Sequence, residues 1–488
     1  MSMLIMFVDT SNKYLERSYT ATRQRCLVPE CESTAPNTTT PGWWPPEADS
    51  RCSKPRLDSS VGSANGSCSR ASFGNATESC NAWFYEHNNS IVSEFDLACQ
   101  EWKRTLVGTI HNVGVLLSMP LMGYISDKWG RRTALVASST GLVFGVLKGL
   151  TSGTHHYALY LALELLEAAI VTGTYTTAFV FMVELIGNDK RILASAALGF
   201  AIALGELSLA LIVWLVPHWK HFQLIVYSPP ALFFSYLFVL DESLRWLLTN
   251  DKKQRASVLI HKMARIDGKD EKTIRDAFEH RDREKEEKFS LRLLFSSTIL
   301  LKRVLVCSWW WFSVALVYYG LAINSVSLPG SRELNFALAS IASIPGDLAA
   351  VVLLDRLGRK KTLFTGFFVC GMGCIATAFV SKEVQWAQIA VYLVGKMGIA
   401  TCFNSVYVYT SELMPTSARS SLVGACSMLA RVGSILAPLT PLLSSWWSAL
   451  PTVVFGCAAL SASALAFAAP ETLHRPLPDT VAQAEALQ

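Results

Sequence analysis

The sequence predicts an all-α protein that crosses a membrane many times and is built from two similar halves. Three observations support this fold class: a low content of charged residues, a series of long apolar runs, and charged motifs that recur at a constant offset. Of the 488 residues, 51% are hydrophobic and only 17% are charged, whereas soluble domains have about 25% charged residues. The composition therefore argues against a soluble enzyme. The mild net charge of +5, with no concentrated basic stretch, argues against a nucleic-acid partner.

The predicted helices are apolar runs long enough to cross a bilayer, which takes about 20 residues. Eleven of them lie at 105–125, 133–151, 157–182, 192–216, 222–240, 303–325, 336–354, 362–381, 386–409, 420–442 and 450–469. Five precede a long polar segment and six follow it, so the first half is one span short. We interpret the apolar stretch at residues 1–8 as the remnant of a first helix, because it is too short to cross a membrane.

An internal repeat indicates that the two groups of helices are homologous. The motif Asp127-x-x-Gly130-Arg131 recurs 228 residues later as Asp355-x-x-Gly358-Arg359. Further pairs have the same offset or one residue more: Glu184 with Glu412, Arg191 with Arg419, and Glu242 with Glu471. Parallel repeats are typical of transporters with six helices in each half, whereas a channel has no need of them. The sequence thus predicts a six-plus-six transporter whose first helix is largely missing.

The stretch before residue 100 has the features of an extracellular segment. It contains half of the twelve cysteines and all of the N-x-S/T glycosylation acceptors. The cysteines are Cys26, Cys31, Cys52, Cys68, Cys80 and Cys99, and the acceptors are Asn37, Asn65, Asn75 and Asn88. This combination is typical of an oxidising compartment. Six cysteines allow fifteen pairings, and the sequence leaves all of them open.

The charges of the loops predict the same orientation. With the cysteine-rich segment outside, the short cytoplasmic loops carry ten basic residues and the short outer loops carry three, as the positive-inside rule requires. The expected organisation is a helix remnant and extracellular loop at 1–104, an N-terminal bundle at 105–244, a cytoplasmic loop at 245–302, a C-terminal bundle at 303–470 and a cytoplasmic tail at 471–488.

Charged residues at the expected cytoplasmic helix ends are candidates for a gate. They are Asp127, Arg131, Glu184, Arg191, Glu242 and Arg245 in the first half, and Asp355, Arg359, Glu412, Arg419 and Glu471 in the second. Ion pairs among them would close the inner face and break during transport. The alternative is that they only anchor the loops. We favour gating, because pairs present in both halves suit a symmetric hinge.

Several blocks resemble a known transporter family. The Asp-x-x-Gly-Arg repeat is similar to the signature of the major facilitator superfamily. Glu242-Ser243-Leu244-Arg245-Trp246-Leu247 resembles the block that closes the first half of sugar and organic-ion porters. Tyr318-Tyr319-Gly320-Leu321, Tyr409-Thr410-Ser411-Glu412, Ala430-Arg431-Val432-Gly433 and Pro470-Glu471-Thr472 resemble the organic ion transporters of solute carrier family 22. The resemblance implies the major facilitator fold, alternating access, and movement of organic anions, cations or zwitterions such as carnitine across the plasma membrane.

One position departs from the family pattern. Glu164 stands where the resemblance leads us to expect an arginine, so the roles of that arginine cannot be carried over. Glu164, Glu167 or Glu206 could instead bind a cation or relay protons. Most of the chain otherwise follows the family, from about Cys26 to Asp479.

Charges inside the predicted spans suggest the kind of substrate, because each costs about 3 kcal/mol at mid-membrane. Arg431 resembles the anion and carnitine members, and its planar guanidinium suits a carboxylate or sulfate. Asp347 could receive an ammonium group of the substrate or pair with Arg431. Together these charges favour a zwitterion or mixed specificity over a pure anion. Lys396 lies in a block common in the family, and we interpret it as a packing residue.

Aromatic residues complete the predicted substrate site. By resemblance, Tyr318, Tyr319, Phe403 and Tyr407 are expected to line the cavity, where rings attract cations and stack on apolar bodies. We expect no catalytic residue, metal or cofactor. Since no G-x-x-x-x-G-K nucleotide-binding motif is present, we expect transport to be facilitative or driven by a gradient. The partners are a small organic ion and the lipid bilayer, with the coupling ion open. The alternatives are a sugar porter, and a non-transporting receptor or inactive paralogue, suggested by the missing first helix and Glu164.

Overall fold

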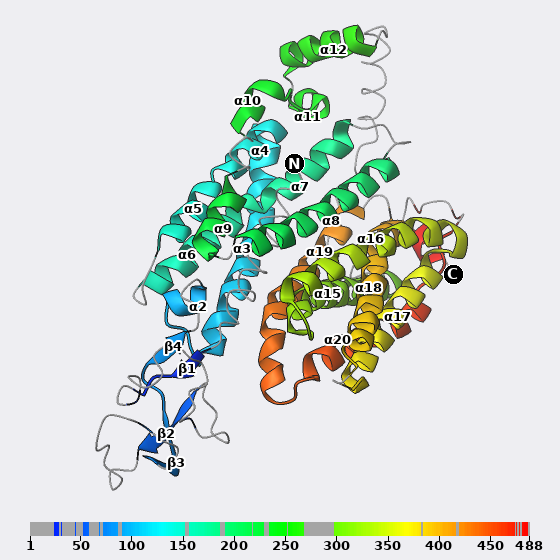
Figure 1. Cartoon of the computed structure of the whole chain (residues 1–488). Coiled ribbons are helices and arrows are strands. Elements are labelled where there is room, and N and C mark those ends of the chain that lie inside the picture. The colour runs from blue at the N-terminus through cyan, green and yellow to red at the C-terminus, as the bar shows by residue number, and fades with distance from the viewer. Residues whose placement is uncertain are drawn as a thin grey trace.

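The structure, a computed structural model, contains two groups of long helices and a small strand-containing segment at one end (Figure 1). It describes residues 24–28, 31, 44, 52–57, 68, 72–85, 90–151, 156–185, 191–216, 218–228, 234–250, 252–267, 297–381, 384–415, 419–473, 475, 478 and 481–486. Residues 1–8, the predicted helix remnant, lie outside this set.

The first group of helices follows the strand-containing segment. It comprises α3 (Glu101–Trp129), α4 (Arg131–Ser139), α5 (Leu142–Leu150), α6 (Tyr157–Val171), α7 (Gly173–Leu185), α8 (Arg191–Leu215), α9 (Trp219–Tyr227) and α10 (Tyr236–Val239). Two helices of the polar connection come next, α11 (Leu244–Thr249) and α12 (Lys253–Asp267). They extend beyond the bundle at the end opposite the strands (Figure 1).

The second group begins with α15 (Thr298–Asn324). It continues through η6 (Ser325–Ser327), α16 (Arg332–Leu357), α17 (Arg359–Phe379), α18 (Gln385–Leu413), α19 (Arg419–Leu436), η7 (Ala437–Ser445), α20 (Leu450–Leu465), η8 (Ala466–Ala468) and α21 (Val481–Ala486). Its core is a single buried cluster of aliphatic, aromatic and cysteine side chains contributed by α15, α17, α18, α19 and α20. This half therefore has a continuous apolar core of its own.

Helices occupy all eleven predicted apolar runs. In the described part of the chain, eight helical stretches are long and apolar enough to cross a membrane. The run at 157–182 is divided into α6 and α7, and the run at 222–240 into α9 and α10. The all-α fold class is confirmed, while the count of eleven spans stays a prediction.

The close packing of α17 on α18 depends on glycines that face each other. A Cβ atom on Gly398 would lie 2.8 Å from the carbonyl oxygen of Gly366, and one on Gly373 would lie 3.1 Å from the Cα of Gly395. Small residues at such positions let helix backbones approach, which is a frequent means of association between membrane helices.

The two groups of helices meet near the end that carries the strands. Helix α16 packs on α8, and both α19 and η7 pack on α3. Leu209 and Val213 of α8 belong to the same buried cluster as Val326 and Phe336 of the second group, and Phe95 beside the strands joins it. This part of the contact between the halves is thus apolar, and it lies on the side of the cysteine-rich segment.

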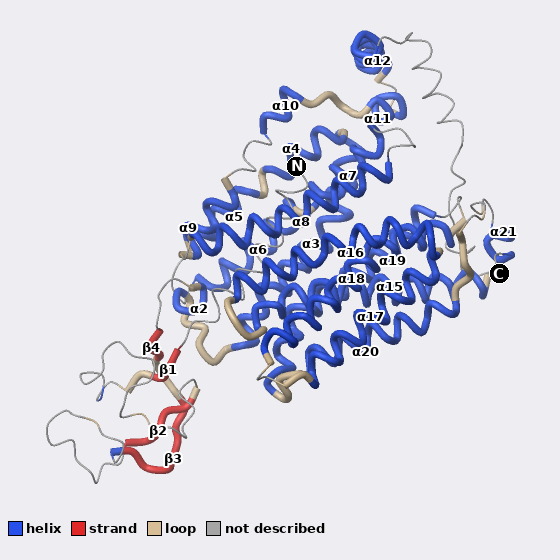
Figure 2. Tube along the Cα trace, turned by 45° about the vertical axis from the view of Figure 1, so that its right-hand side comes forward, coloured by secondary structure: helices blue, strands red, loops and turns tan. Residues whose placement is uncertain are grey.

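The cysteine-rich segment contains two small antiparallel sheets. Strand β1 (Gln24–Cys26) pairs with β4 (Trp83–Tyr85), and β2 (Ser53–Leu57) pairs with β3 (Phe73–Ser79). Figure 2 shows these strands at one end of the molecule, away from most of the helices. The segment needs covalent cross-links, because a two-stranded sheet is too small to be stable on its own.

Three disulfides supply these cross-links. They join Cys26 to Cys80, Cys31 to Cys68 and Cys52 to Cys99, with Cα atoms 5.5, 5.3 and 5.6 Å apart. The predicted disulfide-linked segment is confirmed, and one of the fifteen pairings is now assigned. The remaining six cysteines, all after residue 300, are free.

Polar contacts fix this segment to the first group of helices. The hydroxyl of Tyr85 on β4 donates to Asp96 Oδ1 at 2.5 Å. Burial, together with this bond and the negative charge of Asp96, raises the pKa of the Tyr85 phenol above its usual range. Farther along, Lys220 Nζ lies 3.0 Å from the Glu94 carboxylate of α2 (Ile91–Glu94).

Candidate functional site

A carboxylate caps the helix that follows the first Asp-x-x-Gly-Arg motif. Gly130 has a positive φ of 104°, which turns the chain sharply between α3 and α4. The Glu242 carboxylate accepts the backbone N–H groups of Arg131 at 2.8 Å and Arg132 at 3.2 Å. A negative charge at a helix N-terminus stabilises the unpaired N–H groups and the helix dipole. A Cβ on Gly130 would lie 2.2 Å from this carboxylate, so only glycine fits.

The second half repeats this arrangement. Gly358 has a φ of 95°, and the Glu471 carboxylate accepts the backbone N–H groups of Arg359 at 2.9 Å and Lys360 at 3.1 Å. The structure therefore gives Glu242 and Glu471, two of the predicted gate residues, equivalent roles as helix caps. Sequence reasoning found this pair through its offset and did not foresee the capping.

Among the described residues, each ion pair of the remaining gate candidates lies within one half. Arg131 contacts Asp127 at 2.9 Å, while Arg359 contacts Glu412 at 3.1 Å and Asp355 at 3.7 Å. Thr472, next to the cap, also donates to Glu412 at 2.6 Å. The side chains of Glu184, Arg191, Arg245 and Arg419 lie outside the described residues. The gating role itself stays a prediction.

The predicted aromatic residues form a continuous row. The Phe403 ring lies 5.0 Å from that of Tyr318 and 5.8 Å from that of Tyr407, measured between centroids. Tyr319 meets Tyr318 edge-on at 5.6 Å. Two of these residues lie on α15 and two on α18, so the fold brings together two pairs that are more than 80 residues apart in the sequence.

Acidic and basic groups gather at the Tyr318 end of the row. Lys396 Nζ lies 3.4 Å from the centroid of the Tyr318 ring and donates to the Tyr318 carbonyl at 3.3 Å. Asp347 accepts a hydrogen bond from Asn404 at 2.9 Å. The charges acting on Lys396 are those of Glu206, from the first half, and Asp347. This end therefore carries two carboxylates and one ammonium group.

Arg431 lies at the other end of the row, where its charge acts on Tyr407. Its Nε is buried and has no hydrogen-bond partner in the described part of the chain. Arg431 and Asp347 form no ion pair with each other among the residues that the structure describes. The Arg431 Nε is thus left for another partner, since burying an unsatisfied polar group costs about 1–3 kcal/mol.

A separate group of buried charges occupies the first half. Lys148 Nζ of α5 lies 2.6 Å from Glu164 and 3.1 Å from Glu167, both on α6. Glu164 also contacts His111 of α3 at 2.8 Å, and the side chains of all four residues are at most 1% exposed. The ring of Tyr227 covers Lys148 at 5.1 Å. The cluster ties three helices together away from solvent.

Within the described residues, His111, Glu164 and Glu167 have ligand atoms within 4.8 Å of one another, a spacing that a metal ion could use. The ammonium group of Lys148 already bridges the two carboxylates, however, and supplies the positive charge that they require. We therefore interpret the cluster as a structural ion network.

Comparison with known proteins identifies the family. A family model described as "Sugar (and other) transporter" matches residues 62–481. An organic cation transporter protein of Drosophila melanogaster is 31% identical over 453 residues, which cover 89% of this chain and 81% of the relative. Solute carrier family 22 member 3 of Rattus norvegicus is 30% identical over 408 residues, covering 83% and 74%. The chain belongs to solute carrier family 22.

The fold agrees with this membership. The xylose transporter XylE from E. coli, in an inward open conformation, aligns with a TM-score of 0.64 over 80% of this chain and 90% of that one, at 15% identity. This solute carrier family 22 protein therefore has the major facilitator fold. Since the family and its relatives are transporters, the chain is a multi-pass membrane transporter and not an enzyme.

Sequence reasoning missed three residues of these sites. Lys396, expected to be a packing residue, has its ammonium group over the Tyr318 ring, where the charges of Glu206 and Asp347 act on it. His111 and Lys148 went unremarked, although each is a polar residue within an apolar run, which was the available signal. For this family member, Lys148 explains how Glu164 is tolerated where an arginine is expected.

We predict that Lys148→Met destabilises the protein. It leaves two buried carboxylates without their ammonium partner, a change that typically costs about 3–5 kcal/mol. Thermal unfolding of the purified protein in detergent measures the effect. Lys128→Met, which removes an exposed lysine at the end of α3, is the control. Adding Glu164→Gln to Lys148→Met should recover part of the stability, and an unchanged unfolding temperature for Lys148→Met would contradict the network.

Proposed function

We propose that this protein transports amphiphilic organic ions and that its site favours substrates with both a negative and a positive group. The observation that carries the proposal is the separation of charge along the aromatic row. Arg431 lies at one end, with its Nε unpartnered in the described chain, and Asp347 lies at the other. A zwitterion such as carnitine has matching groups at its two ends.

The charge balance supports this choice. Near Tyr318, the Asp347 carboxylate offers a negative charge to a substrate cation, and the charges of Lys396 and Glu206 act on it. Near Tyr407, Arg431 offers a positive charge to a carboxylate. Between them, Phe403 offers its ring to the apolar body of the substrate.

A pure organic cation is the second candidate, because relatives at about 30% identity are named organic cation transporters. Such a substrate would use Asp347, Glu206 and the rings without Arg431. A sugar is less suited to this site, since sugars need many neutral hydrogen-bonding groups, and here charges and rings predominate.

We predict that Arg431→Ala lowers the uptake of labelled carnitine about 10- to 100-fold, since hydrogen bonds to charged groups contribute about 1.5–3 kcal/mol. Arg431→Lys should restore little, because an ammonium group lacks the planar fork. Asp347→Ala should shift preference from zwitterions toward anions. Uptake into cells, normalised to surface protein, is the measurement, and Arg356→Ala at the end of α16 is the control.

Two results decide between the candidates. Unchanged uptake of every tested anion, zwitterion and cation by surface-expressed Arg431→Ala would refute a binding role for this residue. Loss of zwitterion uptake together with retained uptake of a model organic cation would support the dipolar site over the cation-only site.

We also propose that the repeated charged motifs gate the side of the protein opposite the cysteine-rich segment. The halves pack together on the cysteine-rich side, and the ion pairs between described residues at the opposite helix ends stay within each half. This arrangement suits a conformation closed on one side, in which the pairs change partners when the other side closes.

Asp127→Asn tests the gate. The Asp127 side chain is 78% exposed, so its pair with Arg131 contributes little to stability in this conformation. We expect the unfolding temperature to stay within about 1 °C of wild type, because a surface change is worth at most about 0.5 kcal/mol. Labelling of cysteines introduced at the cytoplasmic helix ends should increase. Unchanged labelling at a normal surface level would make these residues loop anchors only.

The orientation and the plasma-membrane location rest on the glycosylation acceptors. We propose that the segment before α3 is extracellular and the C-terminus cytoplasmic. Asn75 lies on β3, while Asn37, Asn65 and Asn88 lie outside the described residues. Glycosidase treatment of cell-expressed protein should increase its electrophoretic mobility, and substitution of all four asparagines by Gln should abolish this shift. Protection of the segment from external protease would reverse the orientation.

A further inference from the structure

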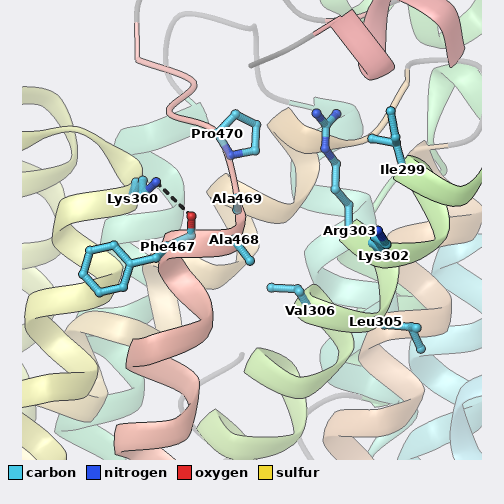
Figure 3. Close-up of a pocket in the computed structure, with 10 residues that line it drawn as sticks. All are labelled: Ile299, Lys302, Arg303, Leu305, Val306, Lys360, Phe467, Ala468, Ala469 and Pro470. Atoms are coloured by element: carbon cyan, nitrogen blue, oxygen red, sulfur yellow. Dashed lines mark hydrogen bonds between the residues drawn. The ribbon is translucent and has the colours of Figure 1, made fainter.

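A basic pocket lies at the helix ends of the second half, away from the aromatic row. It has a volume of about 640 Å³ and opens between α15, the start of α17 and the end of η8. Figure 3 shows Lys360 and Phe467 on one side of it and Ile299, Lys302 and Arg303 of α15 on the other. Neither the substrate site nor the gate uses this pocket.

The residues that line the pocket include three bases and no acid. Arg303 is partly engaged, because it donates to the carbonyl of Ala484 on α21 and the charge of Glu485 acts on it. Lys360 Nζ donates to the Phe467 carbonyl at 3.2 Å. Lys302 forms no ion pair with the described residues, and the nearby Glu471 carboxylate is directed at the backbone of α17. The pocket therefore presents a net positive charge.

The rim of the pocket is apolar. Ile299, Leu305 and Phe467 have exposed fractions of 45%, 61% and 66% in a helix bundle whose outer surface faces lipid. Lys302 lies about one turn after the first residue of α15, and Lys360 is the second residue of α17. Because the ends of membrane-spanning helices reach the headgroup region, both lysines lie at the depth of lipid headgroups. A basic site beside lipid-facing apolar side chains matches a phospholipid, with a charged head and an apolar tail.

The loops beside the pocket are those whose basic residues predict the cytoplasmic side. The cytoplasmic leaflet is the one that carries anionic lipids. We propose that the pocket binds an anionic phospholipid of this leaflet, with its phosphate between Lys302 and Lys360 and an acyl chain along Leu305 and Phe467. The lipid would thus hold the start of α15 against the start of α17 and the end of η8.

The test measures binding to the purified full-length protein in detergent by native mass spectrometry and thermal unfolding. Phosphatidylserine should bind and raise the unfolding temperature more than phosphatidylcholine with the same acyl chains. Lys302→Gln and Lys360→Gln should each weaken phosphatidylserine binding about fivefold, since a basic residue near an anionic lipid contributes about 1 kcal/mol. Lys361→Gln removes a neighbouring base that does not line the pocket and should bind as wild type does.

Two further arms keep the test decisive. Soluble glycerophosphoserine at equal concentration should have no effect, because it lacks the acyl chains that use the rim; an equal effect would make the pocket a free phosphate site. Lys302→Arg with Lys360→Arg should retain binding, which separates lost charge from misfolding. Equal weakening by Lys361→Gln, or equal binding of the two lipids, would overturn the proposal.

Discussion

The free-energy penalty of a charge in hydrocarbon determines how this protein arranges its polar residues. In the first half, ion pairs within the protein offset this penalty. Lys148 contacts the carboxylates of Glu164 and Glu167, and His111 contacts Glu164. In the second half, the charges are distributed differently. Arg431 keeps a buried, unpartnered Nε in the described chain, and Asp347 has an amide as its bonded neighbour. The same constraint thus gives the first half a closed ion network and leaves, mainly in the second half, the charges that the proposed substrate site would use.

A second principle, capping by a distant carboxylate, gives the two halves a common framework. Glu242 and Glu471 each reach back across more than 100 residues to the start of a helix, at a turn that only glycine allows. In the second copy, Arg359 and Thr472 both contact Glu412, while the side chain of its counterpart Glu184 lies outside the described residues. Each half is therefore closed into a unit by its own cap, as a rocking movement of two bodies requires.

The sequence predicted what depends on local pattern. Apolar runs located the helices, and the constant offset identified Glu242 and Glu471 as equivalent before their contacts were known. Contacts between helices were not predictable, because periodicity shows that a residue lies in a span without showing which helix it faces. Glu164 meets Lys148 and His111 across 16 and 53 residues, and neither separation follows from a motif. The disulfide pairing of Cys52 with Cys99 was open for the same reason.

That disulfide has a mechanical consequence. Cys99 lies two residues before Glu101, the first residue of α3, so the covalent bond to Cys52 anchors the cysteine-rich segment to the first half. The ion pair between Lys220 and Glu94 adds a second attachment to the same half. The cysteine-rich segment should therefore move together with the first half when that half rotates. An antibody that bound the cysteine-rich segment and the second half at the same time would restrain the relative movement of the halves. It would slow transport without occupying the substrate site.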